Sequence, residues 1–166
     1  MKEFTIKKPR AVAGYPVHRA VAALVNGAPH IWRDNGETLT IRTSASIACA
    51  GVDLPEVGLS ELRLFNLRAC VGTKVRGKHV YPAKGDHQAR KAWLEKQGLR
   101  LGFALVAVHS ASGTARVMDQ TGRDFILDAT DFTGVLKVTD VQAFQKALRS
   151  GVGSTGRAFG FSLLCI

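Results

Sequence analysis

The sequence predicts an α+β fold built from two tandem ferredoxin-like (RRM-like) βαββαβ units, the first of them abridged. Three observations predict this fold. A strand, an amphipathic helix and a hairpin follow one another at the start, the same order returns from residue 61, and a helix and an apolar strand close the chain. With 166 residues that are 46% apolar, the chain can bury a core as one domain or two small ones. We expect an N-terminal unit over residues 1–60 and a C-terminal unit over 61–166.

The first unit begins with an alternating strand at residues 3–8. An amphipathic helix is predicted at 15–27, because Pro16 suits a first-turn position and Val and Ala recur along one face before an Asn-Gly stop. Two β-rich runs around Asp-Asn-Gly predict a hairpin at 30–44. Residues 45–60 are rich in Ala, Gly and Pro and too short to indicate a second helix, so this unit is abridged.

The second unit opens with an alternating strand at 61–71, followed by a basic, glycine-containing loop at 71–85 that we expect to be mobile. A helix is predicted at 86–98. Asp86 is its expected N-cap and Gly98 its expected stop.

The rest of the second unit completes the ferredoxin-like order. A buried strand is predicted at 99–110, a hairpin at 112–127 and a further strand at 132–138. A short amphipathic helix follows at 140–151, and an apolar strand at 158–166 closes the chain.

The chain is strongly basic, and its charge is concentrated. It has 23 Lys and Arg against 13 Asp and Glu, a formal net charge of +10, and seven of those ten excess charges fall within residues 61–100. A concentrated basic face suits a phosphate backbone, so we expect a nucleic-acid partner. The alternative is a charge that serves only solubility.

The cysteines and the apolar segments indicate a cellular location. Cys49, Cys70 and Cys165 are odd in number and far apart, which is typical of core residues in a reducing cytosol. The first residues lack the continuous apolar stretch of a signal peptide, and the apolar runs are too short to cross a bilayer. We therefore expect a soluble, cytoplasmic protein without a membrane partner.

Residues 151–157, GVGSTGR, match the dinucleotide fingerprint G-x-G-x-x-G and approach a Walker A loop. Both nucleotide motifs need a strand before the glycines and a helix after them, whereas here a helix leads in and a strand leads out. This order argues against a nucleotide loop. Two interpretations remain: glycines that permit a positive φ at a close chain crossing, or a loop with Arg157 that lets an RNA backbone approach.

Tyr15 and His18 stand three residues apart at the start of the first predicted helix, so both project from about the same side of its first turn. Arg19 is adjacent, and the free N–H groups of a helix start favour a phosphate. An imidazole can move the protons that metal-free RNA cleavage requires, a tyrosine hydroxyl can hold it or the phosphate, and a cation can stabilise the phosphorane. The alternative is a structural histidine. The other histidines show no metal spacing, so we expect neither a metal nor a cofactor.

Three stretches resemble the CasE family, the CRISPR RNA-processing endoribonucleases of type I-E systems. GYPVHRAVAALV (14–25) is similar to that family's Tyr-x-x-His helix, and LRLFNLRACVGTKVRGK (62–78) to its central strand and basic loop. The closing segment 132–166 resembles the family's C-terminus, where a glycine-rich loop leads into a Leu-Leu strand. The loop here holds one residue more than the usual family spacing, and Ser162 stands where the family's last glycine would be.

The resemblance implies a repeat-associated mysterious protein (RAMP) that binds the hairpin of a CRISPR repeat. It would cut precursor RNA at the hairpin base without a metal, leaving a 2′,3′-cyclic phosphate and a 5′-hydroxyl, and would stay on its product among other subunits of an effector complex. His18 would be the general acid or base, and Tyr15 would orient the phosphate or the nucleophile. RNA contacts would fall to Arg19, Lys74, Arg76, Lys78, Arg116, Arg123, Gly153, Gly156 and Arg157.

Two other functions are compatible with the residues. One is a repeat-associated relative that holds the guide RNA without cutting it, which hairpin binding without a cleavage product would indicate. The other is an unrelated basic RNA-binding protein, such as a ribosome-associated factor, which would show no preference for a CRISPR repeat.

Overall fold

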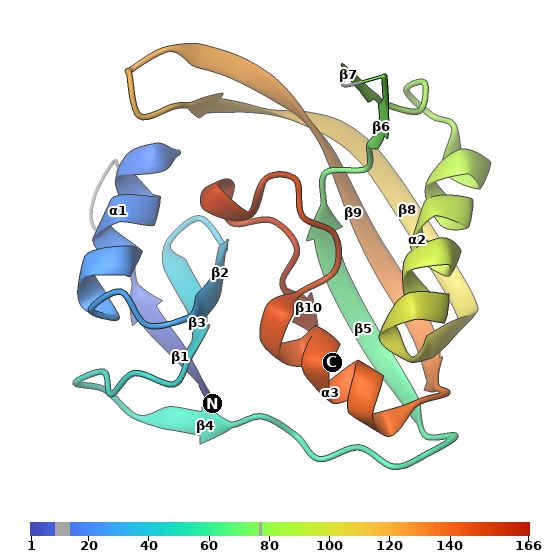
Figure 1. Cartoon of the computed structure of the whole chain (residues 1–166), viewed down its shortest axis with the longest axis horizontal. Helices are drawn as coiled ribbons and strands as arrows, with labels where there is room; N and C mark the ends of the chain where they lie inside the picture. Colours follow the sequence, from blue (N-terminus) through green and yellow to red (C-terminus); the bar gives the residue numbers. More distant parts are fainter. Residues whose placement is uncertain (9–13, 77) are drawn as a thin grey trace.

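The computed structural model describes residues 1–8, 14–76 and 78–166. Within these residues the chain forms two four-stranded antiparallel sheets and a two-stranded ribbon, with three α-helices and one 3₁₀ helix (Figure 1). The predicted α+β class with two tandem ferredoxin-like units is confirmed.

The first sheet has the ferredoxin-like strand order without a second helix. It consists of β1 (Lys2–Lys7), β2 (His30–Asp34), β3 (Thr38–Thr43) and β4 (Gly51–Asp53), in the order β2-β3-β1-β4. β1 pairs antiparallel with both β3 and β4. Helix α1 (Tyr15–Leu24) packs against the sheet through a core of Val17, Val21, Val25, Trp32, Leu39 and Ile41. Residues 44–50, where a second helix would stand, are irregular, so this unit is abridged as predicted.

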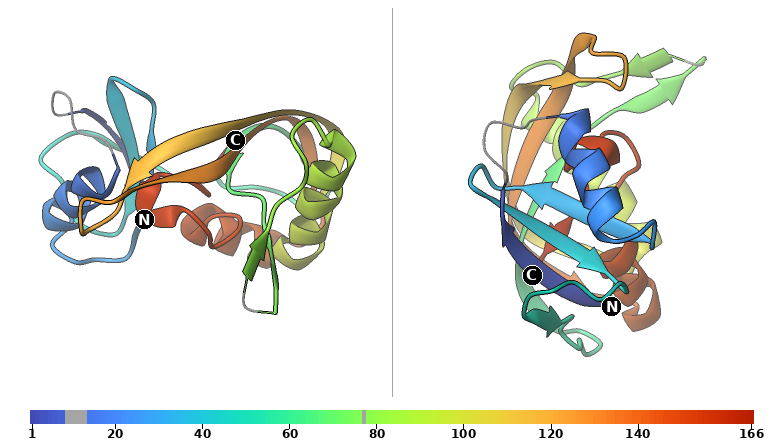
Figure 2. Two further views of the ribbon diagram at one scale, coloured as in Figure 1. Left: turned by 90° about the horizontal axis from the view of Figure 1, so that it is seen from above. Right: turned by 90° about the vertical axis from the view of Figure 1, so that its left-hand side faces the viewer.

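The second sheet has the complete βαββαβ order. It consists of β5 (Leu62–Ala69), β8 (Phe103–Met118), β9 (Asp124–Val138) and β10 (Leu164–Cys165), in the order β10-β5-β9-β8. Helices α2 (His87–Leu101) and α3 (Val141–Ser150) cover one face of it, and the core between them includes Phe65, Leu94, Phe132 and Phe144. The strands β6 (Thr73–Val75) and β7 (Lys78–Val80) form the small ribbon, which projects from the body of the molecule (Figure 2).

Helix α2 begins as predicted and ends later than predicted. The side chain of Asp86 accepts the N–H of Ala89, so the expected N-cap is present. The expectation that Gly98 stops the helix is wrong: the helix runs on to Leu101 and ends at Gly102, whose φ is 75°. Gly98 is instead buried inside the helix, where a Cβ would lie 2.4 Å from the carbonyl oxygen of Phe103. Close packing, and not a positive φ, requires glycine there.

The remaining strands of the second unit differ in extent from the prediction. The segments expected at 112–127 and 132–138 and most of the one expected at 99–110 belong to one long hairpin of β8 and β9, which curves over the top of the molecule in Figure 1. The prediction of a buried strand at 99–110 is wrong in two respects: residues 99–101 end α2, and only Phe103 and Ser110 of the strand residues 103–110 are buried. The expected closing strand is short, because the 3₁₀ helix η1 (Arg157–Phe159) takes up its first part. The expected basic loop contains the β6–β7 ribbon.

Arg42, on β3, joins the two units although it is buried. Its Nε donates to Oε2 of Glu3 at 2.6 Å, within the first sheet. Its Nη1 donates to the carbonyl oxygens of Leu148 at 2.8 Å and Leu164 at 2.7 Å, in the second unit. Leu148 lies in the last turn of α3, where carbonyl groups lack partners within the helix and a cation is favourable. The face of the first sheet opposite α1 therefore lies against the end of α3 and β10.

Candidate active site

The first turn of α1 lies between the first sheet and the tip of the β8–β9 hairpin. The helix begins after Gly14, whose φ is 69°, and has Pro16 in its first turn as predicted. A Cβ on Gly14 would lie 2.9 Å from the backbone nitrogen of Met118, so only glycine lets the end of β8 approach this closely. Val17 is buried against the first sheet, which leaves Tyr15 and His18 on the partly exposed flank of the helix.

Tyr15 and His18 lie together, as their spacing predicts, and a second histidine lies beside them. The ring centroids of Tyr15 and His18 are 5.4 Å apart, and those of His18 and His30 are 6.0 Å apart. His30 opens β2, and because side chains alternate along a strand it shares the face of Trp32, which packs against α1. Arg19 is exposed at the next position of the helix.

The two histidines have different surroundings. Burial lowers the pKa of His18 below its ordinary value of 6.5, and the charge of His30 lowers it further. Nδ1 of His18 is shielded from solvent and has no hydrogen-bond partner among the described residues. Nδ1 of His30 lies 2.8 Å from the carbonyl oxygen of Ala28. A carbonyl oxygen only accepts, so Nδ1 of His30 donates, and its Nε2 remains free for another group.

The glycine loop is a close chain crossing. Gly151, Gly153, Gly156 and Gly160 all have φ between 80° and 83°. A Cβ on Gly160 would lie 2.9 Å from the ring of Trp32, so the last segment of the chain rests directly on β2. η1 contacts both α1 and β2. The nucleotide-loop motif is thus a coincidence of spacing, and the loop brings the end of the chain beside the helix that carries His18.

Arg157 is directed back onto its own loop. Its Nε and Nη2 both donate to the carbonyl oxygen of Gly153, at 2.9 Å and 2.7 Å. Burial lowers the pKa of the guanidinium. Gly153 and Arg157 are therefore linked to each other, and together with Gly156 they form a compact basic loop.

The basic residues expected to bind RNA in the central loop lie on the projecting ribbon. Lys74 belongs to β6 and Lys78 to β7, and Arg76 lies in the turn between the strands with a φ of 48°. Just after the ribbon, the ring of Tyr81 stacks on that of His79 at 6.2 Å. The ribbon therefore presents the exposed Arg76 and Lys78 away from the body of the molecule.

Arg116 and Arg123 lie at the far end of the β8–β9 hairpin, near the start of α1. The guanidinium of Arg116 is exposed and pairs with Asp124, with Nη2 2.8 Å from Oδ2. Arg123 lies in the turn, where its backbone N–H donates to Oδ1 of Asp119 at 3.0 Å. Since Met118 contacts Gly14, the structure brings this basic tip next to the helix that carries Tyr15 and His18.

A cavity of about 290 Å³ lies between the two units beside this tip. Its lining includes Lys8, Arg68 and Arg116 together with Gly14 and Gly160. Lys8 pairs with Asp34 at 2.6 Å, and Arg68 lies 3.6 Å from Asp131. Sequence reasoning did not select Lys8 or Arg68, because their position depends on how the two units pack.

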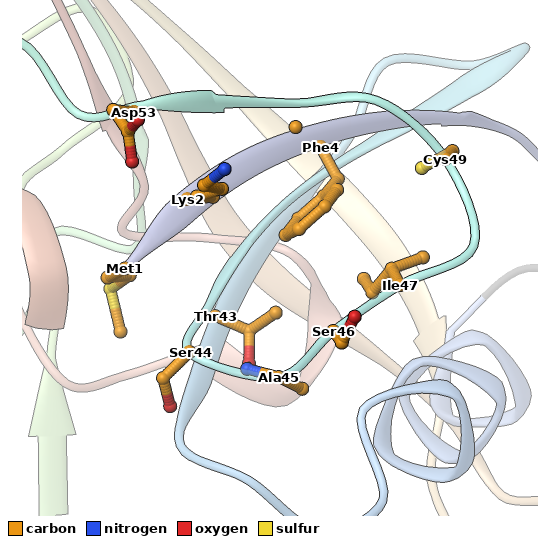
Figure 3. Close-up of a pocket in the computed structure, with 11 residues that line it drawn as sticks. Met1, Lys2, Phe4, Thr43, Ser44, Ala45, Ser46, Ile47, Cys49 and Asp53 are labelled. Carbon is orange, nitrogen blue, oxygen red and sulfur yellow. The ribbon is translucent and has the colours of Figure 1, made fainter.

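Another cavity, of about 380 Å³, lies at the edge of the first sheet (Figure 3). Its walls include the ring of Phe4 and the side chains of Thr43, Ile47 and Cys49. No histidine or tyrosine among the described residues lines it, so the pair of Tyr15 and His18 lies elsewhere.

Across residues 1–8, 14–76 and 78–166, no group of three or more His, Cys, Asp or Glu side chains comes together in a way that could hold a metal ion. Among the helices of the same residues, none is long and apolar enough to span a membrane.

Residues 65–166, more than half of the chain, match the family model of the CRISPR associated protein. The chain belongs to this CRISPR-associated family. A comparison with curated proteins finds no match.

Solved structures extend the similarity of this CRISPR-associated chain to its whole length. The CRISPR endoribonuclease Cse3 bound to 19 nt RNA has 21% identity and a TM-score of 0.83, with 99% of each chain covered. Thermus thermophilus Cse3, bound to an RNA representing a pre-cleavage complex, has 19% identity and a TM-score of 0.77, with 99% of this chain and 98% of that chain covered. A chain of a CRISPR RNA-guided surveillance complex has 15% identity and a TM-score of 0.78, with the same coverage of 99% and 98%. The protein thus has the duplicated ferredoxin-like fold of Cse3.

Proposed function

We propose that this protein is an endoribonuclease that binds the hairpin of a CRISPR repeat and cleaves the precursor RNA without a metal. The observation that carries the proposal is the pair of Tyr15 and His18 at the start of α1, with ring centroids 5.4 Å apart. The pair stands in a CRISPR-associated chain with the fold of Cse3, a protein whose structures contain RNA.

In the proposed reaction, His18 takes the proton of the 2′-hydroxyl beside the scissile phosphate. The 2′-oxygen attacks the phosphorus, the bond from phosphorus to the 5′-oxygen breaks, and the products are a 2′,3′-cyclic phosphate and a 5′-hydroxyl. The lowered pKa of His18 favours the neutral imidazole that can accept a proton. Tyr15 orients the phosphate, and the exposed Arg19 contributes positive charge to it.

The RNA contacts are proposed for three basic elements. The β6–β7 ribbon supplies Lys74, Arg76 and Lys78, and the far end of the β8–β9 hairpin supplies Arg116 and Arg123. The loop that contains Gly153, Gly156 and Arg157 lies against the RNA backbone. In this proposal, residues 1–60 form the unit with the catalytic helix, and residues 61–166 form the unit that binds most of the hairpin. Affinity should fall steeply with salt, because phosphate contacts release counterions.

We also propose that the protein stays on the processed RNA, in the cytoplasm, as one subunit of an effector complex. The similarity to a chain of a CRISPR RNA-guided surveillance complex supports this. Its partners would then be the guide RNA and the other subunits of that assembly.

The test is cleavage of a repeat-hairpin RNA in EDTA by the wild type, His18→Ala and Tyr15→Phe, with His109→Ala as a control on exposed β8. We expect the wild type and the control to produce a cyclic phosphate end, and His18→Ala to be slower by about 10²–10⁴-fold. Equal cleavage by His18→Ala would contradict the role of His18. If the wild type binds the hairpin without cleaving it, the protein is a non-cleaving RNA-binding subunit. If it binds a scrambled hairpin equally well, it is an unrelated RNA-binding protein.

A further inference from the structure

Metal-free cleavage of RNA by transesterification moves two protons. One leaves the 2′-hydroxyl that attacks, and another reaches the 5′-oxygen that departs. Among the helix α1 side chains, only His18 is an imidazole, and one imidazole cannot accept a proton and donate another in the same step. A second proton-transfer group is therefore expected close to His18, where the rings of Tyr15 and His30 lie with centroids 5.4 Å and 6.0 Å away. An imidazolium gives up its proton far more readily than a tyrosine hydroxyl, which favours His30 as the acid.

His30 has the position that such a group requires. It belongs to β2 and not to α1, yet its ring centroid lies 6.0 Å from that of His18. The two ring planes are tilted by 32° to each other, so the two imidazoles direct their nitrogens differently. With a hydrogen-bond reach of about 2.6–3.2 Å from each ring nitrogen, the two imidazoles can contact different oxygens of one phosphate.

The contacts of His30 orient its ring for this task. Its Nδ1 donates to the carbonyl oxygen of Ala28 at 2.8 Å, in the turn that links α1 to β2. This bond holds the imidazole and leaves Nε2 as the nitrogen available to substrate. When Nε2 is protonated as well, the Ala28 carbonyl still accepts from Nδ1, so the cationic ring keeps its orientation.

We propose that His30 is a second catalytic residue, which protonates the leaving 5′-oxygen through Nε2 while His18 takes the proton of the 2′-hydroxyl. The proposal rests on the proposed ribonuclease function. As the 2′-oxygen bonds to phosphorus and the bond to the 5′-oxygen breaks, the proton of Nε2 moves to that oxygen. His18 ends the step protonated and His30 neutral, and proton exchange with water restores both.

The surroundings of the two rings support this assignment. Burial and the charge of His30 both favour the neutral form of His18, as a base requires. Two nearby imidazoles in different environments are a common way to separate acid and base roles.

The test uses a repeat-hairpin RNA in which sulfur replaces the 5′-oxygen of the scissile linkage. A thiol has a pKa near 8.5, far below that of an alcohol, so the sulfur departs without an acid. On normal RNA we expect His30→Ala and His30→Gln to be slower than the wild type by about 10²–10⁴-fold. On the sulfur-containing RNA both variants should approach the wild-type rate, whereas His18→Ala should remain slow.

Three controls make the outcomes distinct. Binding of a hairpin with a 2′-deoxy sugar at the cleavage site should be unchanged in His30→Gln, which shows that the fold and the RNA site persist. His109→Ala should cleave both RNAs like the wild type. If the wild type cleaves neither RNA, the proposed function fails. If the wild type cleaves and His30→Ala cleaves normal RNA equally fast, or is equally impaired on both RNAs, His30 is not the acid.

Discussion

Arg90 and Asp128 form a buried two-pronged ion pair that holds both ends of the β6–β7 ribbon. Nη2 of Arg90 lies 2.8 Å from Oδ1 of Asp128, and Nη1 donates to Oδ2 at 2.9 Å. Asp128 also accepts the N–H of Val71 at 3.2 Å, just before the ribbon. Arg90 donates to the carbonyl oxygen of Pro82 at 3.4 Å, just after it. One ion pair thus sets where the basic ribbon leaves the second sheet.

Asp128→Asn should destabilise the protein strongly, because it leaves the guanidinium of Arg90, whose side chain is only 2% exposed, without its counter-ion. Breaking a buried pair in this way costs about 3–5 kcal/mol in the free energy of unfolding. The matched control is Asp124→Asn, which breaks the pair with Arg116, whose side chain is 78% exposed. We expect the control to cost less than about 1 kcal/mol. Urea denaturation measures the free energy of unfolding of both variants. Equal decreases in the two variants would contradict the structural role of the buried pair.

Ser162→Gly should stabilise the protein. Ser162 has a φ of 78°, a conformation in which a side chain costs about 1–2 kcal/mol, and its buried hydroxyl has no partner among the described residues. We expect the free energy of unfolding to rise by about 1 kcal/mol, measured by thermal and urea denaturation. Gly160→Ala, at a φ of 81°, should have the opposite effect. A loss of stability in Ser162→Gly would show that the serine side chain is favourable there.

His18 should titrate below the ordinary histidine pKa of 6.5, because burial and then the charge of His30 disfavour its protonated form. NMR titration of the imidazole resonances measures this, and His30→Gln should raise the pKa of His18. The unfolded chain then binds the proton more readily than the folded chain. His18 therefore makes its full contribution to the free energy of unfolding when the pH is above its unfolded-state pKa. This contribution declines as the pH falls below 6.5. If the pKa of His18 is at or above 6.5 and does not change in His30→Gln, the proposed effect of His30 on His18 is refuted.

Cys70 should resist alkylation while the protein is folded. Burial raises the pKa of its thiol from 9.0 to about 11, and the thiolate is the form that reacts. The expectation that all three cysteines are core residues is wrong for Cys49, which is exposed. Cys49 should react with iodoacetamide at about pH 8, as measured by mass spectrometry of the labelled peptides. Unfolding in urea should make the two equally reactive. Rapid labelling of Cys70 in the native protein would contradict its buried environment.

The features that depend on local spacing could be predicted from the sequence. The strand–helix–hairpin order and the pairing of Tyr15 with His18 follow from periodicities of two and of three to four residues. The end of α2 could not be predicted, since Gly98 and Gly102 are both acceptable stops and the packing of Phe103 decides between them.

The parts of the candidate site that depend on tertiary packing were also beyond the sequence. His30 lies next to His18 only because β2 returns along α1, and the separation of twelve residues between them in the sequence does not indicate that contact. The one available signal was the alternation that places His30 on the same strand face as Trp32. The contribution of Lys8 and Arg68 to a shared cavity depends on the packing of the two units.

The hydrogen bonds of Arg42 and the contact of Gly160 with Trp32 have a consequence for how the protein is made. Arg42 obtains its carbonyl acceptors from Leu148 and Leu164, and Trp32 is covered by Gly160. Both acceptors lie more than a hundred residues after Arg42 in the chain. During synthesis on the ribosome, the guanidinium of Arg42 therefore lacks these hydrogen bonds until the residues that accept them have been made. The segment that carries His18 therefore reaches its final environment only after residues 148–164 have been made, so chains that stop before them should lack the assembled site.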